Sequence, residues 1–329
     1  MVAFVIRRFL LAILTMWVIS ALSFVIIQLP PGDFVTTYIA QQSASGSSVS
    51  AAEAQALREL YGLDSPFYVQ YGKWILRILS GDFGFSMEWN RPVTEVIGDR
   101  LWLTMLVSFS ALILTWGLAL PIGIYSAVRQ YSIGDYIFTL IGFIGLAVPN
   151  FLLALVIMYL SFRFFGASAG GLFTAEFELA PWSWAKAWDL VKHLPLPAVI
   201  LALAGTAQLI RIMRANLLDE LRRPYVVTAR AKGLSERRAI IKYPVRAALN
   251  PFASTVAYLF PYLVSGSVII SIVLSLPTVG PLLVRSLISQ DMFLAGTIVL
   301  LLGILTVVGT FISDLVLMWI DPRLRHQLD

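Results

Sequence analysis

Six long apolar segments set the pattern of this chain. A helix needs roughly 20 predominantly apolar residues to cross the hydrocarbon core of a membrane. The segments that reach this length are 9–29, 101–128, 136–165, 195–213, 252–276 and 293–320. Two long polar stretches, 30–100 and 214–250, lie between them. The pattern predicts an all-α integral membrane protein with six transmembrane helices, folded as a single membrane domain over residues 1–329.

The first segment also has features of a secretory signal, because Arg7 and Arg8 precede it. Signal peptides have an apolar region of about 7–15 residues and a small-residue cleavage site. Here the apolar run is longer, and Pro30-Pro31 follows it. We therefore interpret residues 9–29 as a retained helix.

The distribution of Lys and Arg predicts the orientation, since short cytoplasmic loops carry an excess of these residues. Six spans place four basic regions on one side: Arg7–Arg8, Arg129, the segment 211–246 with ten Lys/Arg against three acids, and Arg323 with Arg325. The loop 30–100 falls on the opposite side, with eight acidic and five basic residues. Both termini are therefore expected in the cytoplasm. The protein itself is expected in the inner or plasma membrane of a cell.

The outer loop 30–100 is predicted to have structure after a mobile start at residue 41. Ser50 and Glu53 are spaced as a capping box, and Gly62 is placed to end that helix. A second helix is expected with Ser65 as its cap and Pro66 in its first turn, and it should end at Gly81. The loop's tryptophans and one at the start of the second span, Trp74, Trp89 and Trp102, suit the membrane interface.

Two further outer or intramembrane features have more than one interpretation. The segment 276–291 is apolar but short, and it contains Pro277 and Pro281, so it is either a re-entrant or interfacial helix that gates an opening or a plain connector. The prolines inside spans are Pro121, Pro149 and Pro261, and each either kinks its helix beside the substrate pathway or is a helix bend with no substrate contact.

Composition narrows the function classes. The chain is 58% hydrophobic and 13% charged, against about a quarter charged in soluble domains. It has no cysteine and two histidines, His193 and His326, which leaves little material for a metal site. It has no G-x-x-x-x-G-K-[ST] phosphate loop, so we expect no bound cofactor. A membrane-embedded enzyme is disfavoured for the same reasons.

An ion-coupled secondary transporter would need several ionisable residues buried in the membrane. Asp314 is the notable acidic residue within a predicted span. We interpret it as part of a structural ion pair rather than as a proton relay.

The segment 214–250 holds the densest cationic patch, TARAKGLSERRA at residues 228–239, with four basic residues and one acid. Pro224 suits the first turn of a helix over 225–231, and Gly233 suits the left-handed residue that ends it. Ser235 is placed to cap a second helix that starts at Glu236. The charge alone fits either a topology signal touching anionic lipid or a docking element for a cytoplasmic partner.

Several stretches decide between these. The segment 214–250 resembles the EAA loop of binding-protein-dependent ABC transporter permeases, with Val227-Thr228-Ala229 at the triplet and Gly233 at the glycine. The glutamate and first alanine of the general pattern are replaced, as in the dipeptide/oligopeptide subfamily. The chain start through Pro31-Gly32-Asp33, YGLDSPFYVQYGKWILRILSGDFGFS, AVPNF at 147–151 and DLVLMWIDPRLR at 314–325 are similar to the same subfamily in the same order.

The resemblance implies a permease subunit that is not itself an enzyme. Its expected partners are a homologous second permease, two cytoplasmic ATPases or one fused pair that hold ATP and Mg²⁺, an external solute-binding protein and membrane lipid, with no nucleic acid. Short peptides are the expected substrate, with oligosaccharides or nickel chelates as alternatives, moved by alternating access. The expected ATPase-coupling residues are Thr228, Ala229, Arg230, Lys232, Gly233, Leu234, Ser235, Glu236, Arg237 and Arg238.

Overall fold

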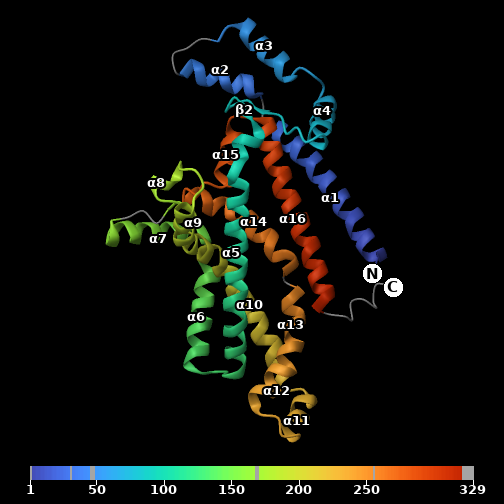
Figure 1. Ribbon diagram of the computed structural model, residues 1–329, viewed down its shortest axis with the longest axis vertical. Coiled ribbons are helices and arrows are strands. Elements are labelled where there is room, and N and C mark those ends of the chain that lie inside the picture. The colour runs from blue at the N-terminus through green and yellow to red at the C-terminus, as the bar shows by residue number, and fades with distance from the viewer. Residues whose placement is uncertain (1, 30–31, 45–48, 167–169, 255, 321–329) are drawn as a thin grey trace. The chain divides into compact units, whose positions relative to one another are not determined.

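The computed structural model describes residues 2–29, 32–44, 49–166, 170–254 and 256–320, which are almost entirely helical (Figure 1). The helices are α1 (Val2–Gln28), α2 (Phe34–Ala44), α3 (Ala51–Tyr61), α4 (Phe67–Leu79), α5 (Val93–Val128), α6 (Ile133–Ala147), α7 (Asn150–Phe165), α8 (Ala175–Glu178), α9 (Trp184–His193), α10 (Pro195–Leu221), α11 (Pro224–Ala231), α12 (Glu236–Lys242), α13 (Pro244–Ser254), α14 (Val256–Val273), α15 (Val279–Ile288) and α16 (Met292–Ile320). One antiparallel pair, β1 (Phe85–Ser86) with β2 (Arg91–Pro92), interrupts them within these ranges. The all-α class is confirmed.

Four helical stretches of the described chain are long and apolar enough to cross a membrane: Ile6–Gln28, Val93–Val128, Trp184–Leu221 and Met292–Ile312. Helices α6 and α7 make a fifth if they count as one span, but they are bent by 104°. The segment predicted at 252–276 falls mainly on α14, of which the apolar part Tyr262–Val273 is shorter than a span. The chain is therefore a multi-pass membrane protein, and the count of six stays a prediction.

The segment predicted as one span over 136–165 is two helices, α6 and α7, and the kink that the sequence allowed at Pro149 is confirmed. A proline has no amide N–H, and its ring disfavours the helical conformation of the residue before it. Val148 accordingly has extended dihedrals, φ −91° and ψ 122°, and α7 begins directly after Pro149. Pro121 does not act in this way, because the non-helical dihedrals inside α5 fall at Gly98.

Some sequence predictions lie outside the described residues. These are Pro30, Pro31, Asp321, Arg323, Arg325 and His326, together with residues 45–48 of the stretch predicted to be mobile. The beginning of that stretch, from Gln41, is instead the last turn of α2, a helix that the sequence analysis missed. Pro261 lies inside α14.

The chain divides into two compact units. One holds residues 102–277 with the end segments 1–5 and 308–329, and the other holds 6–101 and 278–307. In the first unit α10 is the central helix and packs against α6, α7, α13 and α14. Small residues allow this close approach: a Cβ on Gly123 would lie 2.7 Å from the Met213 Cβ, and one on Gly145 would lie 2.9 Å from the Leu203 Cγ.

The second unit has its own apolar core, and Trp74 lies at its centre. The indole is 1% exposed and stands 5.5 Å from the ring of Phe24. Gly296 on α16 gives it room, since a Cβ there would lie 3.1 Å from the Trp74 ring. The predicted interfacial position of Trp74 is therefore wrong, whereas Trp102, which is 55% exposed, remains compatible with one.

Capping explains where the helices of the loop 30–100 begin and end. The Ser50 hydroxyl accepts the Glu53 N–H at 3.1 Å, and Gly62 ends α3 in the left-handed conformation at φ 68°, as predicted. Gly81 ends α4 in the same way at φ 82°. The predicted cap at Ser65 is wrong, because Pro66 is the residue that precedes α4 and no side chain caps that helix.

Helix α15 is the predicted short helix of the segment 276–291. An ion pair joins it to the turn between β1 and β2. Arg285 donates from Nε to the Glu88 Oε1 at 2.6 Å, and its guanidinium lies 4.6 Å from the centre of the Trp89 ring. Asp291, which is fully buried, then caps α16 by accepting the Leu294 N–H at 3.1 Å. Burial raises the pKa of the Asp291 carboxyl, although hydrogen bonds from Ser86 and two backbone amides oppose that rise.

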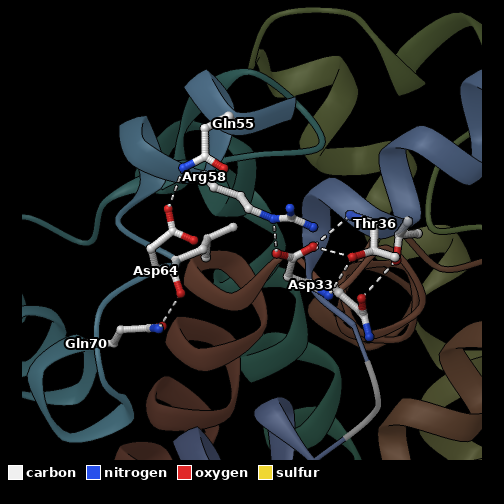
Figure 2. A network of polar contacts seen from close by, with 9 residues as sticks. Asp33, Thr36, Gln55, Arg58, Asp64 and Gln70 are labelled. Carbon is white, nitrogen blue, oxygen red and sulfur yellow. Dashed lines mark hydrogen bonds and ion pairs between the residues drawn. The ribbon is translucent and has the colours of Figure 1, made fainter. Parts of the chain in front are cut away.

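A polar network joins the start of α2 to α3 (Figure 2). Asp33 caps α2 by accepting the Thr36 N–H at 2.7 Å, and Arg58 of α3 donates from Nε to its other oxygen at 2.9 Å. Gln55, about one turn before Arg58 on α3, donates to Asp64 at 3.2 Å. The network therefore fixes how α3 lies against the start of α2.

We predict that acid weakens this attachment of α3. Burial alone would raise the pKa of the Asp33 carboxyl, but the hydrogen bonds from Arg58 and Thr36 outweigh it and hold that pKa below its usual value. A carboxyl with a lower pKa in the folded state stabilises it above the unfolded pKa, about 3.9, and loses this contribution as the pH falls through the folded value. The protection of the α3 amides from hydrogen exchange should decrease as the pH falls below about 3.9. Asp33→Asn should abolish this pH dependence of the protection. Asp64→Asn is the control, and an unchanged pH profile in Asp33→Asn would contradict the role of Asp33.

Candidate functional site

The cationic segment 214–250 forms helix, turn and helix at one end of its unit, beyond α10 and α13 (Figure 1). Helix α10 continues to Leu221, past the predicted end at residue 213. Helix α11 then starts with Pro224 in its first turn, as predicted. One face of α11 is buried, with Val226 at 0% and Ala229 at 6% exposure. The segment is thus an ordered element that packs against its own chain.

The turn after α11 is a Schellman motif with Gly233 at its left-handed position. The Gly233 N–H donates to the Arg230 carbonyl at 2.9 Å, and the Leu234 N–H donates to the Ala229 carbonyl at 3.3 Å. These are the two bonds that define the motif. Gly233 has φ 81°, and a Cβ there would meet nothing within 4 Å. Glycine is therefore needed here for its backbone conformation. The prediction that Gly233 ends α11 as a left-handed residue is confirmed.

The predicted hydroxyl cap at the start of α12 is wrong in its chemistry. Ser235 occupies the N-cap position with extended dihedrals, but its side chain makes no capping hydrogen bond. A bidentate ion pair closes the turn instead: Arg230 donates from Nε to the Glu236 Oε2 at 3.0 Å and from Nη2 to Oε1 at 2.6 Å. Both side chains are exposed, at 43% and 59%, so the pair contributes at most about 1 kcal/mol.

The remaining cations of the turn point to solvent. Lys232, Arg237 and Arg238 are exposed and form no ion pair with the described residues. Ala229, one of the ten expected coupling residues, is buried within the chain. Thr228 is exposed, but its hydroxyl donates back to the Pro224 carbonyl at 3.0 Å. The surface that can contact a partner is therefore narrower than the predicted set of ten residues.

The turn is held by packing behind it. Ala239 and Ile240 of α12 are buried, and Ile240 belongs to the same apolar cluster as Val245 and Ala248 of α13. Tyr225 donates its hydroxyl to Glu220, which ties α11 to the end of α10. Burial and this hydrogen bond raise the pKa of Tyr225 to about 12, so the phenol stays neutral. A displacement of the turn would therefore be transmitted to α10 and α13.

Two features of this unit were missed from the sequence. Val227 and Ile241 are exposed apolar residues beside the turn, at 59% and 64%. Arg214 was assigned to the cytoplasmic loop but lies on α10, where it meets Asp135 of α6. The guanidinium donates from Nε to Oδ1 at 3.0 Å and from Nη2 to Oδ2 at 2.9 Å. No periodicity in the sequence relates residues 79 positions apart, so nothing in the sequence indicated that Arg214 and Asp135 form an ion pair.

The other titratable candidates add little to this site. Asp314 on α16 is half-buried and has an interaction partner. His193 donates from Nδ1 to the Asp189 carbonyl at 2.8 Å, one turn away on α9. Among the residues that the structure describes, no group of three His, Asp or Glu side chains is arranged to hold a metal ion.

Comparison with known families identifies the class of protein. Residues 119–326 match the model of the binding-protein-dependent transport system inner membrane component. Residues 1–108 match the model of the N-terminal part of the same membrane component. The chain belongs to this family. It is therefore a transport permease subunit, and the matched range includes the whole of the α11–α12 turn.

Three curated relatives extend the match over most or all of the chain. The oligopeptide transport system permease protein AppB of Bacillus subtilis is 37% identical, over 99% of this chain and 100% of its own length. The dipeptide transport system permease protein DppB of Lactococcus lactis is 29% identical over 99% and 100%. The oligopeptide transport system permease protein OppB of Mycobacterium bovis is 31% identical over 80% and 82%.

Proposed function

We propose that this chain is the membrane-spanning permease subunit of an ATP-driven importer of di- and oligopeptides. The observation that carries the proposal is the end-to-end similarity to AppB, at 37% identity with 100% of that protein covered. The chain pairs with a homologous permease, two ATPase subunits that bind ATP and Mg²⁺, and an external solute-binding protein. It binds no cofactor itself. Six spans with both termini in the cytoplasm complete this architecture.

The α11–α12 turn is the proposed contact with the ATPases. Support comes from its exposed cations Lys232, Arg237 and Arg238, beside the exposed apolar residue Val227. Surface charge pairs contribute little each, so apolar contact and shape complementarity supply most of the affinity. Because α12 packs on α13 and α11 is tied to α10, motion of an ATPase would reach the membrane helices. Such coupling requires two states in which the contacts of the turn differ.

The test is transport by the complete assembly in proteoliposomes. We expect uptake of radiolabelled trialanine that requires both ATP and the solute-binding protein. Uptake of maltotriose or a nickel chelate in place of trialanine would replace the substrate assignment while keeping the importer class. Uptake driven by an ion gradient without the ATPases would overturn the class and favour a secondary transporter.

A further inference from the structure

The break between α6 and α7 is encoded by the sequence and leaves backbone groups unsatisfied. With 15 and 16 residues, each helix is only about 22–24 Å long, short of the roughly 30 Å hydrocarbon core. Figure 1 shows α7 leaving the axis of α6. Pro149 has no N–H to offer, and no described residue donates a backbone hydrogen bond to the carbonyls of Gly145, Leu146 or Ala147.

A cavity lies at this break. It has a volume of about 260 Å³. Its lining consists of Gly145, Leu146 and residues 148–151 at the break, Ala204 of α10, and Tyr262, Gly266, Ile269 and Ile270 of α14. Its polar side chains are Asn150 and Tyr262, neither of which hydrogen-bonds to a described residue. Gly266 leaves the α14 side open, because a Cβ there would meet nothing within 4 Å.

The surroundings make this arrangement costly unless something polar enters the cavity. Non-helical backbone at membrane depth persists only where it is buried in protein or lines a water-filled cavity. Broken helices whose free carbonyls and amides face such a cavity are a recurring way to bind transported solutes. The carbonyls of the lining residues Gly145 and Leu146 accept hydrogen bonds, and the Asn150 amide both donates and accepts. Together they match a ligand with alternating N–H and C=O groups.

We propose that the break between α6 and α7 is a contact site for the main chain of the transported peptide. This assignment rests on the proposed function and adds the location and the chemistry of recognition. The carbonyls at the end of α6 accept peptide N–H groups, and Asn150 pairs with a peptide bond. The Tyr262 hydroxyl donates to a peptide carbonyl. Recognition through the main chain is indifferent to side chains, which suits a subunit that passes peptides of varied sequence.

The absence of cysteine from the whole sequence makes single-cysteine labelling in the complete transporter the direct test. Asn150→Cys should react with a charged, water-soluble methanethiosulfonate. Trialanine, delivered by its binding protein in the presence of a non-hydrolysable ATP analogue, should slow the reaction. The control is Leu155→Cys, on the same helix and outside the cavity lining, which should react about tenfold more slowly because a thiol in an apolar setting stays protonated. Labelling without protection, or labelling only by a lipophilic reagent, would overturn the assignment.

A tyrosine pair keeps the test valid if the cysteine variant does not insert. Tyr262→Phe removes the hydroxyl that lines the cavity, and Tyr159→Phe removes one at an exposed position on α7, 61% exposed, away from it. Tyr262→Phe should lower trialanine import by about fivefold, the value of one hydrogen bond, with ATP hydrolysis retained, and Tyr159→Phe should not. Equal import by the two variants would overturn the site, whereas failure of the parent assembly to import trialanine would overturn the proposed function instead.

Discussion

Replacing Gly233 by valine is expected to reduce ATP-driven import by at least about tenfold while the chain still inserts at its normal level. Gly233 holds φ 81° at the Schellman turn. The left-handed conformation costs an ordinary L-residue roughly 1–2 kcal/mol, and a β-branched side chain is worse placed there. Since about 1.4 kcal/mol is a factor of ten, the native turn would become about tenfold less favoured relative to other conformations. The direction of α12 relative to α11 would then change, and with it the surface offered to the ATPase.

A matched control is available in the other unit. Gly62 has φ 68° at the end of α3, and a Cβ there also meets nothing within 4 Å. Gly62→Val therefore imposes the same kind of backbone strain without touching the coupling turn. Co-purification of the ATPases with each variant is the measurement. Loss of ATPase from Gly233→Val but not from Gly62→Val is expected, whereas parent-level binding and import in Gly233→Val would contradict the role of the turn. Gly233→Asn, which tolerates this conformation better, should retain most of the activity.

The second large effect concerns the ion pair between α6 and α10. Arg214→Met should destabilise the folded chain by about 3–5 kcal/mol, the range for breaking a buried pair by removing one partner. The Asp135 side chain is only 4% exposed. Without Arg214, the main hydrogen bond left to its carboxylate is the one from the Tyr131 N–H, at 2.9 Å. Asp135→Asn should cost less, because the Arg214 side chain is 27% exposed and reaches solvent.

Unfolding of the purified chain in mixed micelles by increasing denaturing detergent measures this difference. Arg211→Met is the control, since Arg211 is an exposed arginine on the same helix. The double variant Asp135→Asn with Arg214→Met should lose less than the sum of the two single losses, because the second change no longer strands a charge. Equal losses for Arg211→Met and Arg214→Met would show that the pair contributes nothing.

Local rules predicted the cationic turn well, because its conformation is decided within a few residues. Pro at the first turn of α11 and glycine at the end of the same helix each have a steric reason that acts through the backbone alone. Ser235 takes the cap position but its side chain makes no capping hydrogen bond, and the Arg230–Glu236 ion pair closes the turn instead. The same local reasoning located Ser50, Gly62 and Gly81 correctly.

Tertiary features were beyond the sequence patterns. Trp74 was assigned to the membrane interface from residue type, yet the ring is enclosed by Phe24 and α16, segments that are distant in the chain. The apolar run over 136–165 has the length of one span. The sequence named Pro149 as a possible kink, but it did not show that the bend there reaches 104°. Asp135 and Arg214 meet only because α6 packs on α10. The exposure of individual residues of the turn also depends on tertiary packing: Ala229 is buried, whereas Val227, two residues earlier, is exposed.

The central claim is that the α11–α12 turn lies in the cytoplasm and is covered by the ATPases. Lys232→Cys tests it most directly, since this exposed position would carry the chain's sole thiol. In intact cells a membrane-impermeant maleimide should leave this cysteine unlabelled. After the membrane is opened, it should be labelled rapidly in the permease alone and slowly when the ATPases are bound. Labelling in intact cells, or equal labelling with and without bound ATPases, would contradict the account.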